Sequence, residues 1–306
     1  MTATIVRGRP WPFIDTVANL LSVPNKLLFL NADFESHAID EEVERDLRGF
    51  IDRYAIDDVH IRLNAWMPLD ELARLWSNRR VSIVLRATIG MLSWVAYCLN
   101  IGRLFGGDHY NPFSDTVNLY SNNRSIALHE LGHVKDFRSV RYPGGYALLR
   151  MLPVVSLWQE YLASLFAVQY LRELGDHDEE LAAYRLLFPA YSTYVFGALL
   201  EWFPSSLTRG LMLPVIAGGH VIGEAVARTR GTQLGVALDG RAGDVTRFRE
   251  MFSPSTEEGV VNLSTGTGLV LGSSACGVLA PVGAWIGFML ARLRNRGTIK
   301  DNPHVQ

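Results

Sequence analysis

Near the middle of the chain, a short segment combines two histidines and a glutamate at the spacing of a metal site. His129 and His133 are four residues apart, so on an α-helix both imidazoles project from one face. Glu130 follows the first histidine, where a carboxylate can accept a proton from a water molecule beside the metal. The rest of 125–137 is rich in apolar residues, so this helix should be buried. The HExxH arrangement predicts a zinc site with Glu130 as a catalytic base.

A third protein ligand is expected from a second helix, over 154–170. This stretch is apolar almost throughout, and Glu160 is its only acid. A lone carboxylate among apolar side chains is explained either by an ion pair with Arg150 or Arg172 or by a metal ion shared with the two histidines. The metal ion is the preferred interpretation. Asp136, on the first helix, is an alternative third ligand or a hydrogen-bond partner of a ligand.

Together, the two helices resemble those of the gluzincin group of zinc metallopeptidases. The resemblance covers about residues 105–170 and is closest to the membrane-embedded branches, which include the heat-shock membrane proteases and the prenyl-protein proteases. It implies a zincin-like core, Zn²⁺ as the cofactor and hydrolysis of peptide bonds. Those branches carry Glu-x-x-Ala-Asp in the second helix, and here the sequence from Glu160 onwards has Ser164 in place of the Asp. In this chain Ser164 therefore stands where those proteases support a zinc-bound histidine.

The segment before the metal helix, 106–120, predicts a β-hairpin. It contains turn residues followed by a short run with alternating apolar positions. In related zincins a strand at this place pairs with an extended peptide substrate, although a plain connecting hairpin is equally well supported. The residues of the candidate edge strand are Thr116, Val117, Asn118 and Leu119. A second alternating run at 59–64 could join this strand in a small sheet.

Hydrolysis also needs a hydrogen-bond donor for the oxyanion that forms on the substrate carbonyl. The sequence offers several side chains for this role or for a substrate contact, and it does not rank them. They are His109, Tyr191, Tyr194 and His220.

Long apolar segments indicate a membrane protein. The mean hydropathy is +0.11, and residues 259–291 contain no charged side chain. This uncharged stretch is longer than the roughly 20 residues that a helix needs to cross a bilayer. A second crossing is expected at 81–105, and 186–227 reads as two helices that form a hairpin or re-entrant pair. Pairs of glycines four residues apart predict close helix contacts; they are Gly219 and Gly223, Gly268 and Gly272, and Gly283 and Gly287.

The predicted fold is mainly α, with a zincin-like metal-binding helical core, a small β-hairpin or sheet, and three or four transmembrane helices. The expected parts are an amphipathic, interfacial region with a short strand, a transmembrane helix, the catalytic core, and glycine-rich transmembrane helices followed by a tail. They occupy 1–80, 81–105, 106–180 and 181–306. Basic residues after 291 predict a cytoplasmic C-terminus.

The expected function is that of a membrane-embedded, zinc-dependent metalloprotease that acts on protein or peptide substrates. One alternative is a non-catalytic membrane sensor or scaffold with a structural zinc site. Another is a glycine-rich membrane-packing or channel-like protein in which HExxH is incidental. The formal net charge of −2 gives no basic footprint for nucleic acid.

Overall fold

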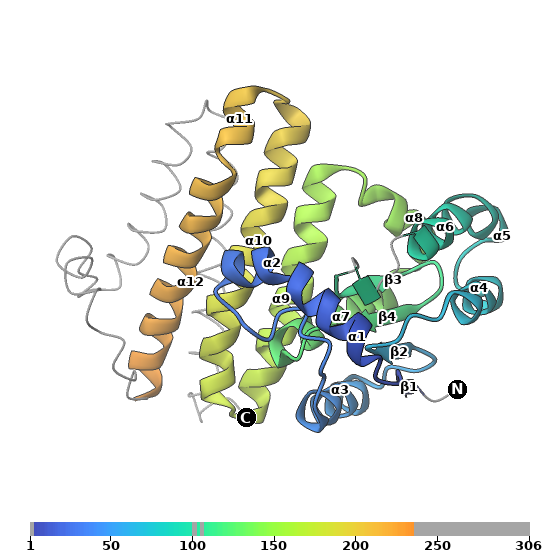
Figure 1. Ribbon diagram of the computed structural model, residues 1–306, viewed down its shortest axis with the longest axis horizontal. Coiled ribbons are helices and arrows are strands. Elements are labelled where there is room, and N and C mark those ends of the chain that lie inside the picture. Colours follow the sequence, from blue (N-terminus) through green and yellow to red (C-terminus); the bar gives the residue numbers. More distant parts are fainter. Residues whose placement is uncertain (1–2, 100–102, 105–106, 236–306) are drawn as a thin grey trace, which may run out of the picture. The chain divides into compact units, whose positions relative to one another are not determined.

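The computed structural model describes residues 3–99, 103–104 and 107–235, and Figure 1 shows their arrangement. This part of the chain is mainly α-helical with one small mixed sheet, as the sequence predicts. Its elements, in chain order, are β1 (Thr4–Arg7), α1 (Pro12–Leu21), α2 (Val23–Phe29), α3 (Glu41–Tyr54), β2 (His60–Leu63), α4 (Pro68–Ser77), α5 (Ile83–Leu85), a π-helical turn (Arg86–Gly90), α6 (Met91–Leu99), β3 (His109–Asn111), β4 (Thr116–Leu119), α7 (Arg124–Ser139), α8 (Pro143–Leu149), α9 (Pro153–Leu174), α10 (His177–Trp202), α11 (Ser206–Gly210) and α12 (Met212–Leu234).

The four strands are ordered β1-β2-β4-β3. β3 and β4 form the predicted antiparallel hairpin, and β2 pairs in parallel with β4, with Ile61 opposite Val117. The prediction that β4 is an open edge is wrong, because β2 and β3 occupy both of its sides and all four of its residues are buried. Thr116, Val117, Asn118 and Leu119 therefore have no free backbone edge for a substrate. The edge strands of the sheet are β1 and β3.

A buried ion pair ties α4 to the sheet. Arg62 on β2 and Glu71 on α4 are both fully buried, and Nη1 of the arginine lies 2.5 Å from Oε2 of the glutamate. The same carboxylate accepts hydrogen bonds from side chains of the β3–β4 hairpin: Asn111 at 2.7 Å, Ser114 at 2.5 Å and Thr116 at 2.9 Å. Burying a charge without partners is costly, so this set of donors is what permits an acid at the position.

Helices α7 and α9 are the two helices that the sequence predicts for the metal site. α7 begins at an N-cap, Asn123, whose side chain accepts a hydrogen bond from the backbone of Ile126 at 3.1 Å. α9 begins with Pro153 in its first turn, and Gly175, which follows its last residue, caps it with φ = 71°. α9 packs against α7 on one side and α10 on the other. Local sequence thus sets the start of α7 and both ends of α9, and the site lies where the two helices meet.

Helices α10 and α12 pack side by side as the predicted hairpin, with α11 between them (Figure 1). The glycine pair predicted to permit close contact does so. A Cβ atom on Gly219 would lie 2.7 Å from Cα of Pro189, and one on Gly223 would lie 2.6 Å from the carbonyl oxygen of Tyr184. Glu224, on the same helix, forms ion pairs with Arg185 at 2.7 Å and with Arg228 at 2.6 Å.

Within the described residues, one helical stretch, Thr208–Leu234, which comprises the end of α11 and all of α12, is long and apolar enough to cross a membrane. The predicted crossing at 81–105 contains a shorter apolar stretch, Ile83–Leu99, interrupted by the π-helical turn. Helices α8 and α9 would together make a span that is bent by 118°. The predicted crossing at 259–291 lies outside the described residues, as do the pairs Gly268 and Gly272, and Gly283 and Gly287.

Candidate metal centre

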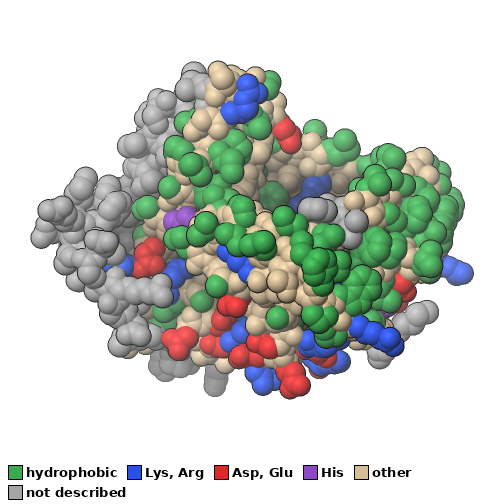
Figure 2. All heavy atoms as spheres, in the orientation of Figure 1, with side chains coloured by type: hydrophobic (Ala, Val, Ile, Leu, Met, Phe, Trp, Pro, Cys, Tyr) green, Lys and Arg blue, Asp and Glu red, His purple; other side chains and the backbone are tan. Residues whose placement is uncertain are grey.

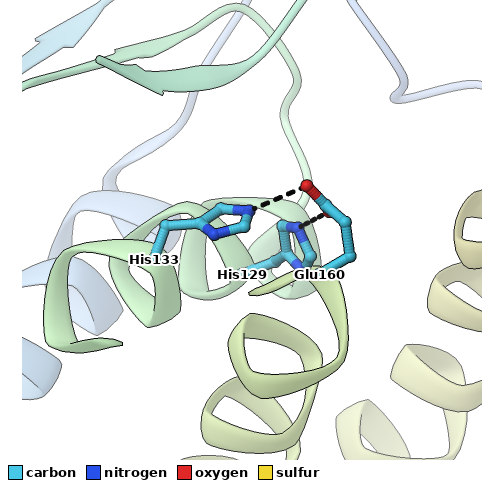
Figure 3. A group of neighbouring side chains, drawn as sticks. All are labelled: His129, His133 and Glu160. Atoms are coloured by element: carbon cyan, nitrogen blue, oxygen red, sulfur yellow. Dashed lines mark hydrogen bonds and ion pairs between the residues drawn. The ribbon is translucent and has the colours of Figure 1, made fainter. Parts of the chain in front are cut away.

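The two histidines of α7 and the glutamate of α9 converge on one point, as Figure 3 shows. Nε2 of His129 lies 3.1 Å from Oε2 of Glu160, and Nε2 of His133 lies 3.4 Å from Oε1 of the same carboxylate. One ligand atom from each residue lies within 4.8 Å of the others. Tetrahedral zinc with bonds of about 2.0–2.1 Å places its ligand atoms about 3.3 Å apart. Each imidazole nitrogen already lies at about this separation from a carboxylate oxygen, while the widest spacing in the group, up to 4.8 Å, would have to close by about 1.5 Å.

A residue that the sequence analysis missed makes this convergence possible. A Cβ atom on Gly132, inside the HExxH segment, would lie 2.4 Å from the carbonyl oxygen of Ala163 and 2.8 Å from its Cα. Only a glycine lets α7 approach the backbone of α9 this closely. Since Ala163 follows Glu160 by three residues, the contact sets how far the carboxylate must reach. The small residues at these two positions were a signal in the sequence for such an approach.

Ser164 occupies the supporting position that the resemblance assigns to it. Its Oγ lies 3.1 Å from Nδ1 of His129. If that nitrogen carries the proton and donates to the hydroxyl, Nε2 is left with its lone pair towards Glu160, where a metal ligand needs it. The hydroxyl thus takes the place of the carboxylate of the gluzincin pattern and brings no additional charge to the site.

Asp136 is buried on α7, and the metal-ligating group consists of His129, His133 and Glu160 without it. The pKa of Asp136 is raised to about 6 by burial, against which a hydrogen bond with Tyr146 acts. Its Oδ2 and the Nδ1 of His133 are both buried without a hydrogen-bond partner among the described residues. Buried polar atoms without partners are uncommon. The ring nitrogen of His133 that faces away from Glu160 therefore still has room for a hydrogen-bond partner.

Glu160 also has the ion pair that the sequence offered as an alternative explanation. Arg150, at the corner between α8 and α9, donates from Nη2 to Oε1 of the glutamate. The glutamate itself is 1% exposed. The structure confirms the ion pair with Arg150, and the same carboxylate also faces the two imidazoles, so the metal ion stays a prediction. Arg172, the other arginine considered, pairs with Glu180 at 2.5 Å.

The burial of α7 separates the pKa values of its ionisable groups in the metal-free protein. Burial lowers the pKa of His133 to about 4, so this imidazole is neutral at physiological pH. For His129 burial acts in the same direction, but the hydrogen bond and charge of Glu160 outweigh it and raise the pKa. Burial raises the pKa of Glu130 to about 7. A carboxylate with a pKa near neutrality has the value that suits a general base or acid.

The candidates for a substrate or oxyanion contact separate into two groups. The ring centroid of Tyr194 is 6.0 Å from the guanidinium of Arg150, and the charge of Glu160 raises the pKa of the tyrosine hydroxyl. Tyr194 is exposed, so a substrate can approach it. The hydroxyl of Tyr191 instead donates to the carbonyl oxygen of Leu157 at 3.3 Å. Burial and the charge of Glu160 raise the pKa of Tyr191 as well, so both tyrosines lie near the site, and Tyr194 is the exposed one that faces Arg150.

The two histidine candidates make contacts with backbone and side chains elsewhere. In the β3–β4 hairpin, Nδ1 of His109 lies 2.9 Å from the carbonyl oxygen of Gly107 and Nε2 lies 3.2 Å from Nδ2 of Asn118. The first nitrogen donates and the second accepts, which fixes the tautomer. His220 on α12 donates from Nε2 to the carbonyl oxygen of Leu28 at 2.8 Å. Neither belongs to the metal-ligating group.

The arrangement as a whole provides two nitrogen ligands, one oxygen ligand, an adjacent carboxylate with a near-neutral pKa, and an exposed tyrosine. Three protein ligands with a position left for water distinguish catalytic zinc sites from closed structural ones. The chain matches no family model, no curated protein and no solved structure.

Proposed function

We propose that this protein is a zinc-dependent metallopeptidase associated with a membrane. The observation that carries the proposal is the convergence of His129, His133 and Glu160 from two helices, with their ligand atoms within 4.8 Å of one another. The resemblance of the HExxH and Glu160–Ser164 segments to the membrane-embedded gluzincins adds to it. A zincin-like core and a protein or peptide substrate follow as parts of the same proposal.

In this proposal the three ligands hold Zn²⁺, which would lower the pKa of a water molecule to about 7 and polarise the substrate carbonyl. Glu130 accepts a proton from the attacking water on its carboxylate and passes it to the leaving amine. Ser164 keeps the proton of His129 on Nδ1. Tyr194 is exposed and its ring faces Arg150 beside the ligands, so its hydroxyl is the group we expect to contact the substrate oxyanion.

The proposal favours catalysis over the alternative of a structural zinc site in a sensor or scaffold. A structural site is closed by four protein ligands, whereas the group found among the described residues supplies three. Glu130 would also have no role in a structural site, although it is almost fully buried beside the ligands and its burial works against its charge.

A comparison of the wild-type chain with Glu130→Gln tests the proposal. The zinc content of both purified proteins is measured together with cleavage of fluorescently labelled casein. We expect both to hold zinc and Glu130→Gln to cleave at least about 100-fold more slowly, which is the usual contribution of a general base. A variant that cleaves casein at the wild-type rate would remove Glu130 from the chemistry.

We further propose that the bilayer is the second partner of this chain. Large apolar side chains are exposed on or next to the helices that flank the sheet, such as Phe13 at 79% on α1, Leu30 at 78% just after α2, and Leu99 at 76% on α6. Figure 2 shows apolar side chains across the middle of one face, over α1, α2 and α4–α6, while charged side chains gather along its lower edge. Soluble monomers rarely expose patches of this extent.

Two stretches are proposed to cross the bilayer. They are Thr208–Leu234 and the uncharged stretch 259–291. We place the shorter Ile83–Leu99 at the membrane surface, since 17 residues of helix span about 25 Å and the hydrocarbon core is about 30 Å thick. The basic residues after 291 assign the C-terminus to the cytoplasm. A multi-pass count of three or four crossings stays a prediction.

Extraction of membranes at alkaline pH tests this placement. Carbonate washes release proteins that are bound to the surface and leave proteins that cross the bilayer in the membrane pellet. We expect the full chain to stay in the pellet after the wash and to enter solution only with detergent. Recovery of the chain in the carbonate supernatant would contradict the two proposed crossings.

A further inference from the structure

The guanidinium of Arg150 is built into the metal site. It donates from Nη2 to Glu160, and from Nη1 to Oε1 of Gln159 at 3.3 Å. Gln159 is fully buried, and its Nε2 donates to the carbonyl oxygen of Tyr146 on α8 at 3.1 Å. The arginine is thereby held in place by a side chain that is itself anchored, and it stands beside the carboxylate that the proposed function assigns to zinc.

The charges around this carboxylate explain why a guanidinium is there. Without a metal, Glu160 is a buried carboxylate whose other partners are the two imidazoles, which carry a positive charge only when they are protonated. A neutral imidazole does not supply the positive charge that a buried carboxylate requires. Arg150 supplies it. When a divalent ion binds, the carboxylate gains a second and stronger cation, and the two like charges repel each other.

Arg150 lies where its guanidinium can move away from Glu160 when a metal ion binds. Its side chain is 34% exposed, while the carboxylate that it contacts is 1% exposed. If Glu160 turns towards a metal, the guanidinium can replace the lost hydrogen bond with water. The carboxylate of Glu160 cannot replace a lost hydrogen bond in this way, because it is buried away from solvent.

We propose that Arg150 is the resident cation of the empty metal site: it neutralises Glu160 before a metal binds, and it competes with zinc for that carboxylate. It thus keeps the metal-free site folded and weakens zinc binding, so it sets the zinc concentration at which the site is filled. This inference rests on the proposed function only in taking zinc as the ion that the three ligands bind.

The sign of a change in zinc affinity separates this role from a purely positioning one. Groups that only orient a ligand weaken metal binding about 10- to 100-fold when they are removed. A competing cation has the opposite effect, because its removal destabilises the metal-free state more than the zinc-bound state. Ser164, which orients His129 without carrying a charge, serves as the reference for the first behaviour.

The experiment measures zinc affinity by competition with a chelator, and the melting temperature of the metal-free protein, for four variants of the full chain in detergent. For Arg150→Met we expect at least about five-fold tighter zinc binding and a lower metal-free melting temperature. Arg150→Lys, which keeps the charge, should stay close to the wild type. Ser164→Ala should bind zinc about 10-fold more weakly. Arg172→Met, which breaks the pair with the buried Glu180, should lose stability and keep the zinc affinity.

A double variant keeps the proposal testable if Arg150→Met does not fold without zinc. In a Glu160→Gln background there is no buried charge to neutralise, so Arg150→Met should cost little further stability. An equal loss of stability in both backgrounds would overturn the proposal, as would weaker or unchanged zinc binding by Arg150→Met. These readouts need no substrate, so an absence of casein cleavage would count against the peptidase alone, whereas a wild-type chain that binds no zinc would overturn both.

Discussion

Glu71 at the sheet and Glu160 at the α7–α9 contact are both buried glutamates. Burying a carboxylate is costly unless it has partners, and these two acids have different partners. Both side chains are at most 1% exposed, and each faces one arginine. The remaining partners of Glu71 are the amide of an asparagine and two hydroxyls, which only need to donate hydrogen bonds to it. The remaining partners of Glu160 are two imidazoles, which can exchange a proton for a metal ion.

This difference indicates which buried acid is structural and which is functional. The groups around Glu71 do not gain or lose protons near neutral pH, so this hydrogen-bond network has a single protonation state. Around Glu160 there are ionisable groups whose pKa values are moved apart, with His133 lowered to about 4 and Glu130 raised to about 7 by burial. Groups with perturbed pKa values gather at functional sites. Burial of an acid alone therefore says little, and the identity of its partners says more.

The largest expected effect tests this contrast directly. Glu160→Ala should lower zinc affinity at least about 100-fold, because it removes a ligand where even supporting groups are worth 10- to 100-fold. Glu71→Ala should leave zinc stoichiometry unchanged and destabilise the fold by about 3–5 kcal/mol, because it leaves Arg62 buried without its main partner. Chelator competition measures the zinc affinity of each variant, and chemical denaturation measures its free energy of unfolding. Equal zinc loss in both variants would erase the distinction between the two acids.

The second prediction concerns the pH dependence of stability without metal. The pKa of Glu130 is about 7 in the folded protein against an ordinary value of 4.5, so its ionisation costs stability above pH 7 and this cost is absent below pH 4.5. Glu130→Gln carries no such charge. At pH 8 it should be more stable than the wild type by about 3 kcal/mol, and at pH 5 by about 1 kcal/mol. Denaturation curves that show the same difference at both pH values would contradict the raised pKa.

A smaller effect is expected from the contact between the two ligand-bearing helices. Gly132→Ala would place a methyl group against the backbone of Ala163, which cannot move as a side chain does. We expect a loss of about 1–3 kcal/mol in stability and weaker zinc binding as α7 and α9 separate. The matched control is Gly197→Ala on α10, where a Cβ atom meets nothing within 4 Å. If the two variants unfold at the same denaturant concentration, the close approach does not hold the site together.

Much of the site could be predicted because its residues act through local spacing. The interval between His129 and His133 determines a shared helix face whatever the rest of the fold does, and the lone acid at Glu160 was conspicuous in an apolar helix. The close approach at Gly132 was not predicted, since a glycine shows its purpose only when the partner helix is known. The sequence offered Arg150 and Arg172 alike as ion-pair partners of Glu160, and the choice of Arg150 depends on the corner between α8 and α9, which local spacing does not reveal.

The fold was predictable in kind and less so in arrangement. The hairpin at β3 and β4 and the strand β2 follow from alternation and turn residues, which are local signals. The alternation at 59–64 predicts that this strand can join Thr116–Leu119 in a sheet. The order of the strands, however, depends on pairing between distant segments, so the prediction did not place β2 along the side of β4 that it left open for a substrate. That long-range pairing is why Thr116–Leu119 is an interior strand and not a docking edge.

The most direct test of the account is the zinc content of the purified full chain after dialysis, measured by plasma mass spectrometry alongside a variant with both His129→Ala and His133→Ala. The account predicts one zinc ion per wild-type chain and none in the double variant. A wild-type chain without zinc, or a double variant that retains as much zinc as the wild type, would contradict the claim that these imidazoles bind the ion.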